Sequence, residues 1–283
     1  PSSISLYRDF IITRDYMVMT TEVTRSLFSA VMEYNPSYFS CSGDCPVENL
    51  YRREAMYFAN KVSDIAELPN CYDCITDESG NLTGCSIAVE YNDDFTSCMG
   101  YRLPTEAEHM YATQSGSTEH VWTEDGGGST DLHNCEEGIT IDDGGETPLL
   151  SDYAWYCANT SDPRLVGQKN PNGYGLYDML GNVWEWTQDN VYQISWNTTS
   201  SVPYNEIDPF AALGTREVVR GGSYYENSAI NYYYRWAVNQ NYRDRNIGFR
   251  LVKTVNNLPQ KPSLWLEEQD DNSLHCSITQ GSY

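Results

Sequence analysis

Positive charge is scarce in this sequence. Lys and Arg total 17 against 40 Asp and Glu, which gives a formal net charge of −23. A surface this acidic repels phosphate backbones and anionic headgroups, so we expect no nucleic acid and no anionic membrane as partner. No apolar run reaches the roughly 18 residues that span a bilayer, so we expect no membrane insertion. No charged and apolar leader opens the chain, which indicates a signal peptide that was removed or never included.

Histidine is rare and cysteine is unevenly distributed. The four histidines, at 109, 120, 133 and 275, show no spacing typical of metal ligands, and no cysteine lies between Cys157 and Cys276. The other cysteines occupy one stretch, and their even number indicates four disulfides formed in an oxidising compartment. They are Cys41, Cys45, Cys71, Cys74, Cys85, Cys98, Cys135 and Cys157.

The spacing of these cysteines suggests some pairings and leaves others open. Cys41 with Cys45 would close one loop, and Cys135 with Cys157 would complete the set. The four cysteines between them can form two bridges by any of three pairings. A zinc site with these four thiolates is the alternative, but the usual second close pair is missing. Cys276 has no evident partner.

Hydrophobic periodicity predicts two main amphipathic helices. One would begin at Thr21 and end at Asn35-Pro36, and the second would run from about Glu48 to Ser63. A short third helix would follow Thr105, whose side chain forms a capping box with Glu108. Core strands are expected within 4–20, 216–223 and 247–252, and a long surface loop over 114–150.

The composition changes after Lys253. We therefore expect a main domain over 1–256, and over 257–283 a linker followed by the start of a truncated, possibly immunoglobulin-like, second domain. Gly 20 and Pro 12 predict a loop-rich fold, while 23 Tyr, 7 Trp and 7 Phe exclude a disordered chain.

Eight motifs occur in a characteristic order. They are Glu22-Val-Thr, Asn35-Pro-Ser-Tyr-Phe, Pro46-Val-Glu, Tyr101-Arg-Leu-Pro-Thr-Glu-Ala-Glu, Asn172-Gly-Tyr-Gly-Leu-Tyr, Gly181-Asn-Val-Trp-Glu-Trp, Arg220-Gly-Gly-Ser and Gly248-Phe-Arg. Together they closely resemble the formylglycine-generating enzyme family, or sulfatase-modifying factors, over about residues 4–253. The resemblance implies an α+β domain with a C-type lectin fold, whose N- and C-terminal strands pair.

The resemblance also locates a missing active site. The family's enzymes oxidise a substrate cysteine with two cysteines and copper, three and eight residues after the Ser of Arg-Gly-Gly-Ser. Here those positions hold Glu226 and Asn231. Because thiolates are what hold Cu(I), we expect no copper and no oxidase activity. A related branch needs an iron-binding histidine motif, which is absent from this sequence.

Residues 224–246 contain six Tyr and five Asn. Tyrosine offers rigid contact area and Asn adaptable hydrogen bonds, the chemistry of an antibody paratope. The segment resembles the variable proteins of diversity-generating retroelements, in which residues before a terminal Gly-Phe-Arg strand vary. We expect a variable binding face for a protein, for example on a host or cell surface, with strand alternation burying some rings. The candidates are Tyr224, Tyr225, Asn227, Tyr232, Tyr234, Trp236, Asn239, Asn241 and Tyr242.

The resemblance further implies a calcium site. Asp178 and Glu185 match side-chain ligands of the family, with the carbonyls of Gly181 and Val183 completing the loop. The alternative is that both acids hydrogen-bond to the backbone. We expect a non-catalytic binding protein that is secreted or displayed on a cell or virion surface. An enzyme with a different mechanism and a structural or carbohydrate-binding module remain as alternatives.

Overall fold

The computed structural model describes most of the chain. The described residues are 10–117, 119, 121–124, 127–129, 135, 137–142, 144, 147–191, 207–226, 230–232, 234–255 and 278–279. The histidines at 120, 133 and 275, Cys276, and nearly all of the predicted second domain therefore lie outside the described residues. Within the described part, each helix is too short or too polar to span a bilayer.

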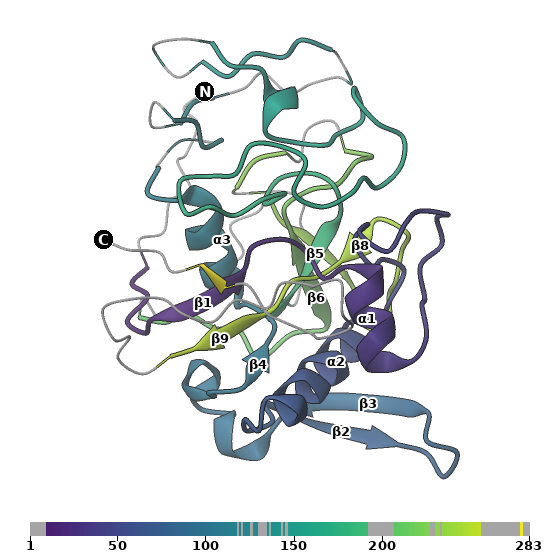
Figure 1. Cartoon of the computed structure of the whole chain (residues 1–283). Coiled ribbons are helices and arrows are strands. Elements are labelled where there is room, and N and C mark those ends of the chain that lie inside the picture. The colour runs from purple at the N-terminus through teal and green to yellow at the C-terminus, as the bar shows by residue number, and fades with distance from the viewer. Residues whose placement is uncertain are drawn as a thin grey trace.

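The two ends of the domain meet in one antiparallel sheet. Its order is β10 (Ile278–Thr279), β1 (Tyr16–Met19), β9 (Val252–Thr254) and β4 (Tyr101–Arg102). Tyr16 lies opposite Thr254, and Val18 opposite Val252. Figure 1 shows β1 and β9 side by side. The expected pairing of N- and C-terminal strands is therefore confirmed.

Three α-helices flank the sheets, and the first two begin later than predicted. Helix α1 (Arg25–Met32) is capped by Thr24, whose hydroxyl accepts from the Leu27 amide at 3.2 Å. It ends at Glu33, which adopts a left-handed φ of 64°. A helix from Thr21 is wrong, because residues 21–24 extend along Phe249 and Pro46 instead.

Helix α2 (Arg52–Ile65) begins after Glu48, contrary to the prediction. The Glu54 carboxylate accepts from the Tyr51 amide at 2.7 Å and fixes the start. Glu48 is instead buried, where its carboxylate accepts from Arg25 and from the Phe39 amide at 3.1 and 3.0 Å. It therefore shapes the loop between the two helices.

Helix α3 (Glu106–Gln114) confirms the predicted third helix. Thr105 accepts from the Glu108 amide at 3.1 Å, and Glu108 accepts from the Thr105 amide at 2.8 Å, which completes the capping box. Three short 3-10 helices, η1 (Val89–Tyr91), η2 (Phe95–Ser97) and η3 (Leu150–Asp152), lie in the connections.

A second four-stranded sheet lies behind the first. Its order is β7 (Trp236–Asn239), β6 (Arg216–Arg220), β5 (Trp184–Val191) and β8 (Ile247–Gly248). The predicted strand 247–252 is divided, because β8 pairs with β5 and β9 pairs with β1. The fully buried Arg250 stands at this crossing between the sheets.

A two-stranded hairpin carries much of the disulfide framework. Strands β2 (Tyr72–Thr76) and β3 (Leu82–Ile87) lie beside α2 and extend from the lower edge of the molecule in Figure 1. Cys74 lies opposite Cys85 in the register, and the two form a disulfide. Cys71 pairs with Cys98, which resolves the open pairing and makes the zinc alternative wrong.

The other two predicted disulfides are confirmed. Cys41 is bonded to Cys45 in the loop before α2, and Cys135 to Cys157 in the long stretch between α3 and β5. The described parts of that stretch form loops at the top of Figure 1. All eight cysteines of the central region are therefore used in cross-links.

The main core contains a trio of buried phenylalanines. Phe28 of α1 stacks on Phe58 of α2 with ring centroids 5.4 Å apart, and Phe249 meets Phe58 edge-on at 5.3 Å. Each of the three rings is 0% exposed. This contact attaches both helices to the strand crossing around Arg250, which positions the loop before α2 against residues 224–246.

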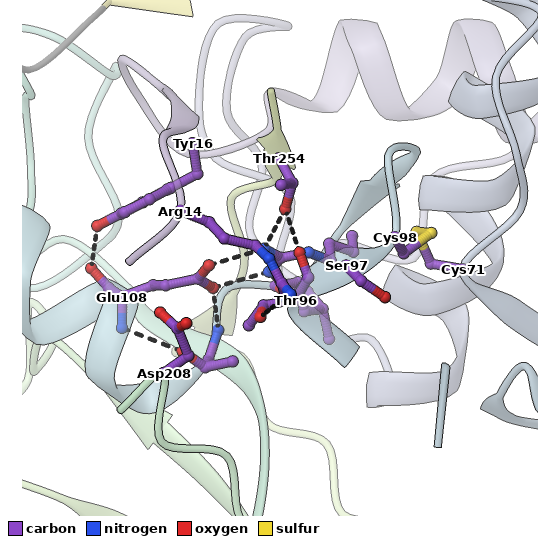
Figure 2. Close-up of polar contacts among 12 residues, drawn as sticks. Arg14, Tyr16, Cys71, Thr96, Ser97, Cys98, Glu108, Asp208 and Thr254 are labelled. Carbon is purple, nitrogen blue, oxygen red and sulfur yellow. Dashed lines mark hydrogen bonds and ion pairs between the residues drawn. A yellow bond between two sulfur atoms is a disulfide. The ribbon is translucent and has the colours of Figure 1, made fainter. Parts of the chain in front are cut away.

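A buried ion pair connects α3 to the sheet that contains β1, β9 and β4. Arg102 donates to both oxygens of Glu108 at 2.7 Å and to the Thr254 hydroxyl at 2.8 Å. Figure 2 shows Thr254 reaching Thr96, and Tyr16 donating to the Glu108 carbonyl at 2.8 Å. Both side chains of the ion pair are nearly inaccessible, so each charge depends on the other.

Replacing Glu108 by Gln should destabilise the fold strongly. The change leaves the Arg102 guanidinium buried without a countercharge, and we expect the free energy of unfolding to fall by about 3–5 kcal/mol. Urea titrations at pH 7 measure it. Asp94→Asn is the matched control, because the Arg14–Asp94 pair is exposed at 35% and 49% of its side chains. That change should cost at most about 1 kcal/mol. Equal losses for the two variants would contradict this account.

Candidate functional site

A sharp turn follows β6 and leads to Glu226, the first of the two positions that the resemblance matches to cysteines. Gly221 and Gly222 have φ of 94° and 78°, a left-handed conformation that favours glycine. The turn places the Tyr224 amide against the Asn182 carbonyl at 2.8 Å. The Glu226 amide then donates to the Ser223 carbonyl at 3.0 Å. The Arg-Gly-Gly-Ser motif thus sets the backbone path of residues 224–226 after β6.

Glu226 and Asn231 have different environments. The Glu226 carboxylate accepts from the Trp184 indole Nε1 at 3.2 Å and remains partly accessible, and burial raises the pKa of its carboxyl group. Asn231 is buried, and its Oδ1 accepts from the Tyr234 amide at 2.9 Å. Glu226 thus presents a carboxylate, and Asn231 holds the local backbone. Neither side chain supplies the soft ligand that Cu(I) prefers.

Four aromatic rings gather beside Glu226. The Trp184 ring centroid lies 5.7 Å from that of Trp236 and 6.2 Å from that of Tyr234, and Tyr242 meets Trp236 at 5.6 Å. Trp184 is fully buried and forms the floor, whereas the other three rings are half-buried. We refer to Trp184, Tyr234, Trp236 and Tyr242 as the aromatic cluster.

The same segment is anchored to α3 by charge. The Glu106 carboxylate of α3 pairs with both Arg235 and Arg220. Arg220 also donates to the carbonyls of Tyr232 and Tyr234 at 3.1 and 3.0 Å. These contacts hold the backbone at Tyr232 and Tyr234. The position of the Tyr234 ring is therefore set by the held backbone as well as by its contact with Trp184.

The structure divides the predicted binding residues by exposure. Tyr225 is 70% exposed, and Asn239 and Asn241 are also exposed. Tyr224 and Tyr232 are 2% and 5% exposed, so these two rings belong to the interior and not to the surface. Three of the candidates are half-buried in the aromatic cluster: Tyr234, Trp236 and Tyr242. Asn227 lies outside the described residues.

Tyr224 is buried because the loop before α2 covers it. Its ring meets Phe39 edge-on at 5.6 Å. Tyr38, next to Phe39, is 65% exposed, and the Arg245 guanidinium lies 5.4 Å from its ring centroid. Tyr38 and Arg245 thus lie in and against the loop that covers Tyr224. Sequence reasoning missed Tyr38, although the Asn-Pro-Ser-Tyr-Phe motif marked its loop.

A second arginine and aromatic contact borders this surface. Arg53 and Arg243 both lie over the Tyr51 ring, at 4.0 and 4.8 Å from its centroid. Arg53 also donates to Asn241 Oδ1 at 2.7 Å. The start of α2 therefore contributes to the edge of the predicted face. Nothing in residues 224–246 alone indicates this contribution.

The predicted calcium ligands fit only in part. Asp178 Oδ2 accepts from the Gly167 amide at 2.7 Å, while its buried Oδ1 has no partner among the described residues. Burial raises the pKa of Asp178 to about 6. Within the described residues, no group of three His, Cys, Asp or Glu side chains is arranged as a metal site. Asp178 therefore keeps one oxygen that a cation could use.

Glu185 is already engaged. Arg250 donates to both carboxylate oxygens at 2.7–2.9 Å, and His109 Nε2 lies 3.1 Å from Oε2. Burial opposes ionisation of Glu185, but Arg250 and His109 together outweigh it, and the pKa of the carboxyl group is lowered. This carboxylate does not fit the ligand role while it holds Arg250. Calcium binding at the loop, including the carbonyls of Gly181 and Val183, stays a prediction.

Relatives of known sequence support a family assignment. The chain matches the Sulfatase-modifying factor enzyme 1-like domain over residues 7–255. It is 32% identical over 211 residues to the chaperone protein LppX of Paenibacillus barcinonensis, covering 69% of this chain and 72% of that protein. It is 35% identical over 140 residues to the formylglycine-generating enzyme of Mycobacterium tuberculosis, covering 48% of this chain and 39% of that enzyme.

Solved structures agree with the fold. Treponema denticola variable protein 1 superposes with a TM-score of 0.62 at 32% identity, covering 84% of each chain. PvdO from Pseudomonas aeruginosa has a TM-score of 0.57 at 16% identity over 85% of this chain, a likeness of fold alone. The expected α+β fold of the C-type lectin type is confirmed. By its match over residues 7–255, the chain belongs to the sulfatase-modifying factor family.

Proposed function

We propose that this chain is a non-catalytic binding protein whose segment 224–246 forms a diversified contact face. The observation that carries the proposal is that Glu226 and Asn231, the positions that the resemblance matches to the two cysteines of the enzymes, carry no thiol. Asn231 is committed to the backbone of Tyr234, and Glu226 to the indole of Trp184. The site therefore has no thiolate pair for copper chemistry, while exposed and half-buried aromatic and amide side chains surround it.

The arrangement of the segment supports diversification. Its backbone is held by Glu106 through Arg235 and Arg220, so side chains on the other side can change without loss of that anchor. The similarity to Treponema denticola variable protein 1 favours the same role. A protein is the favoured partner, because large aromatic side chains dominate protein contact energy. The similarity to a protein named as a chaperone agrees with a protein partner.

The disulfides support a location outside the reducing cytoplasm. Four cross-links, one of them joining the partly exposed strands β2 and β3, favour an oxidising compartment. We therefore propose secretion or display on a cell or virion surface.

Natural copies of this protein should differ mainly within residues 224–246. Substitutions should concentrate at exposed and half-buried positions such as Tyr225, Trp236 and Asn239, whereas Arg235 and Arg250 should stay constant because buried charges depend on them. Sequencing the locus in related strains measures this. A reverse transcriptase and a template repeat should adjoin it. Differences spread evenly along the chain, without that apparatus, would contradict the proposal.

The chain should not convert cysteine to formylglycine. Incubated with copper and a sulfatase-type cysteine peptide, it should yield no aldehyde by mass spectrometry, because neither Glu226 nor Asn231 can bind Cu(I) as a thiolate. The formylglycine-generating enzyme of Mycobacterium tuberculosis serves as the positive control. Aldehyde formation by this chain would support an enzyme of different mechanism and refute the binding proposal.

Calcium should stabilise the fold through Asp178. Because a cation that binds the native state alone raises stability, the melting temperature should rise with added CaCl₂ and fall with EDTA. Asp178→Asn removes one carboxylate charge and should abolish the calcium dependence. Asp94→Asn, which changes an exposed carboxylate elsewhere, is the control and should preserve it. A melting temperature insensitive to calcium would show that Asp178 serves the backbone alone.

A further inference from the structure

Glu226 is an acidic group placed against aromatic rings. Its Oε1 accepts one hydrogen bond, from the Trp184 indole at 3.2 Å. Among the described residues, no Lys, Arg or His forms an ion pair with it. The carboxylate is partly buried but still reaches solvent. A partly desolvated negative charge of this kind attracts a cation more strongly than an exposed carboxylate does.

The four rings of the aromatic cluster are inclined to one another and not stacked in parallel. The ring planes of Trp184 and Trp236 are inclined by 55°, those of Trp184 and Tyr234 by 42°, and those of Trp236 and Tyr242 by 76°. Inclined rings present faces in several directions, whereas parallel rings cover each other. The face of an aromatic ring carries negative potential and attracts organic cations, with Trp the strongest.

The arginines near this segment are engaged elsewhere. Arg220 and Arg235 pair with Glu106. Arg245 lies over the rings of Tyr38 and Phe39, and Arg243 over Tyr51. These four arginines therefore contact other groups, and none of them is paired with the Glu226 carboxylate. The net charge of −23 adds a long-range attraction for positive ligands.

We propose that Glu226 and the aromatic cluster form a subsite for an organic cation, which in a protein partner is the side chain of a lysine or arginine. The half-buried rings of Tyr234 and Trp236 would contact the charged group and the Glu226 carboxylate would pair with it. This inference rests on the proposed binding function and adds the chemistry of the recognised group. A lysine-bearing loop on the partner would bring its ammonium group to Glu226 from the solvent side of these rings.

Matched pairs of small probes test the subsite. Choline and 3,3-dimethylbutan-1-ol have nearly the same shape, but choline alone carries a positive charge. Nα-acetyl-lysinamide and Nα-acetyl-norleucinamide form a second pair for the lysine side chain. Binding is followed by tryptophan fluorescence and by NMR titration of the intact chain. We expect each cation to bind about tenfold more tightly than its neutral counterpart.

Substitutions at Glu226 and Trp236 test whether these two side chains cause the preference for the charged probes. Glu226→Gln keeps the shape and the hydrogen bond from Trp184, and should weaken choline binding about tenfold while leaving 3,3-dimethylbutan-1-ol unchanged. Glu90→Gln, an exposed carboxylate on η1, removes the same charge outside the cluster and should change neither. Trp236→Leu should weaken choline binding, with its melting temperature measured to verify folding.

Two results would overturn the subsite. Equal binding of each charged probe and its neutral counterpart would indicate an apolar surface without cation recognition. Absence of binding by all four probes would exclude an organic cation. Either outcome leaves the comparison of natural copies untouched, so failure of this inference is distinguishable from failure of the proposed function.

Discussion

The buried guanidinium of Arg250 is the interaction on which the rest of the structure depends. It donates to both oxygens of Glu185 on β5 and to the carbonyls of Met19, Thr20 and Tyr177. One planar cation therefore joins both sheets and the loop that leads to β5. Because a buried charge without these partners is costly, the crossing between β8 and β9 has a single arrangement. The proposed contact face lies in the segment 224–246, which leads directly into this crossing.

In the segment that follows β6, the residues that anchor the backbone differ from those whose side chains remain accessible. Arg220 and Arg235 attach it to Glu106 beneath, and the buried rings of Tyr224 and Tyr232 fill the interior. The half-buried rings of Tyr234 and Trp236 lie against Trp184, and the amides of Asn239 and Asn241 are exposed. A face of this type can change its side chains while its backbone stays in place, since the anchoring ion pairs do not involve the accessible groups. The proposed cation subsite uses that arrangement.

Local features were predictable where neighbouring residues alone decide them. The Thr105–Glu108 capping box needs only contacts within one turn, and the sequence indicated it correctly. The starts of the first two helices were misplaced because distant partners decide them. The sequence predicts a start of the second helix at about Glu48, but Arg25 and the amides of the preceding loop hold Glu48 outside the helix. The chosen pairing of Cys71 with Cys98 likewise required the three-dimensional path of the chain.

The amino-acid sequence by itself determined the family resemblance, the four-disulfide framework and the absence of thiols at positions 226 and 231, because each is a matter of residue identity and order. The tertiary structure decided which tyrosines face solvent. It buried Tyr224 behind Phe39 and exposed Tyr225, the next residue, and it brought the loop of Tyr38 into contact with Arg245 of the segment 224–246. The physical reason is that exposure depends on which segments pack over a side chain, and those segments lie far apart in the sequence.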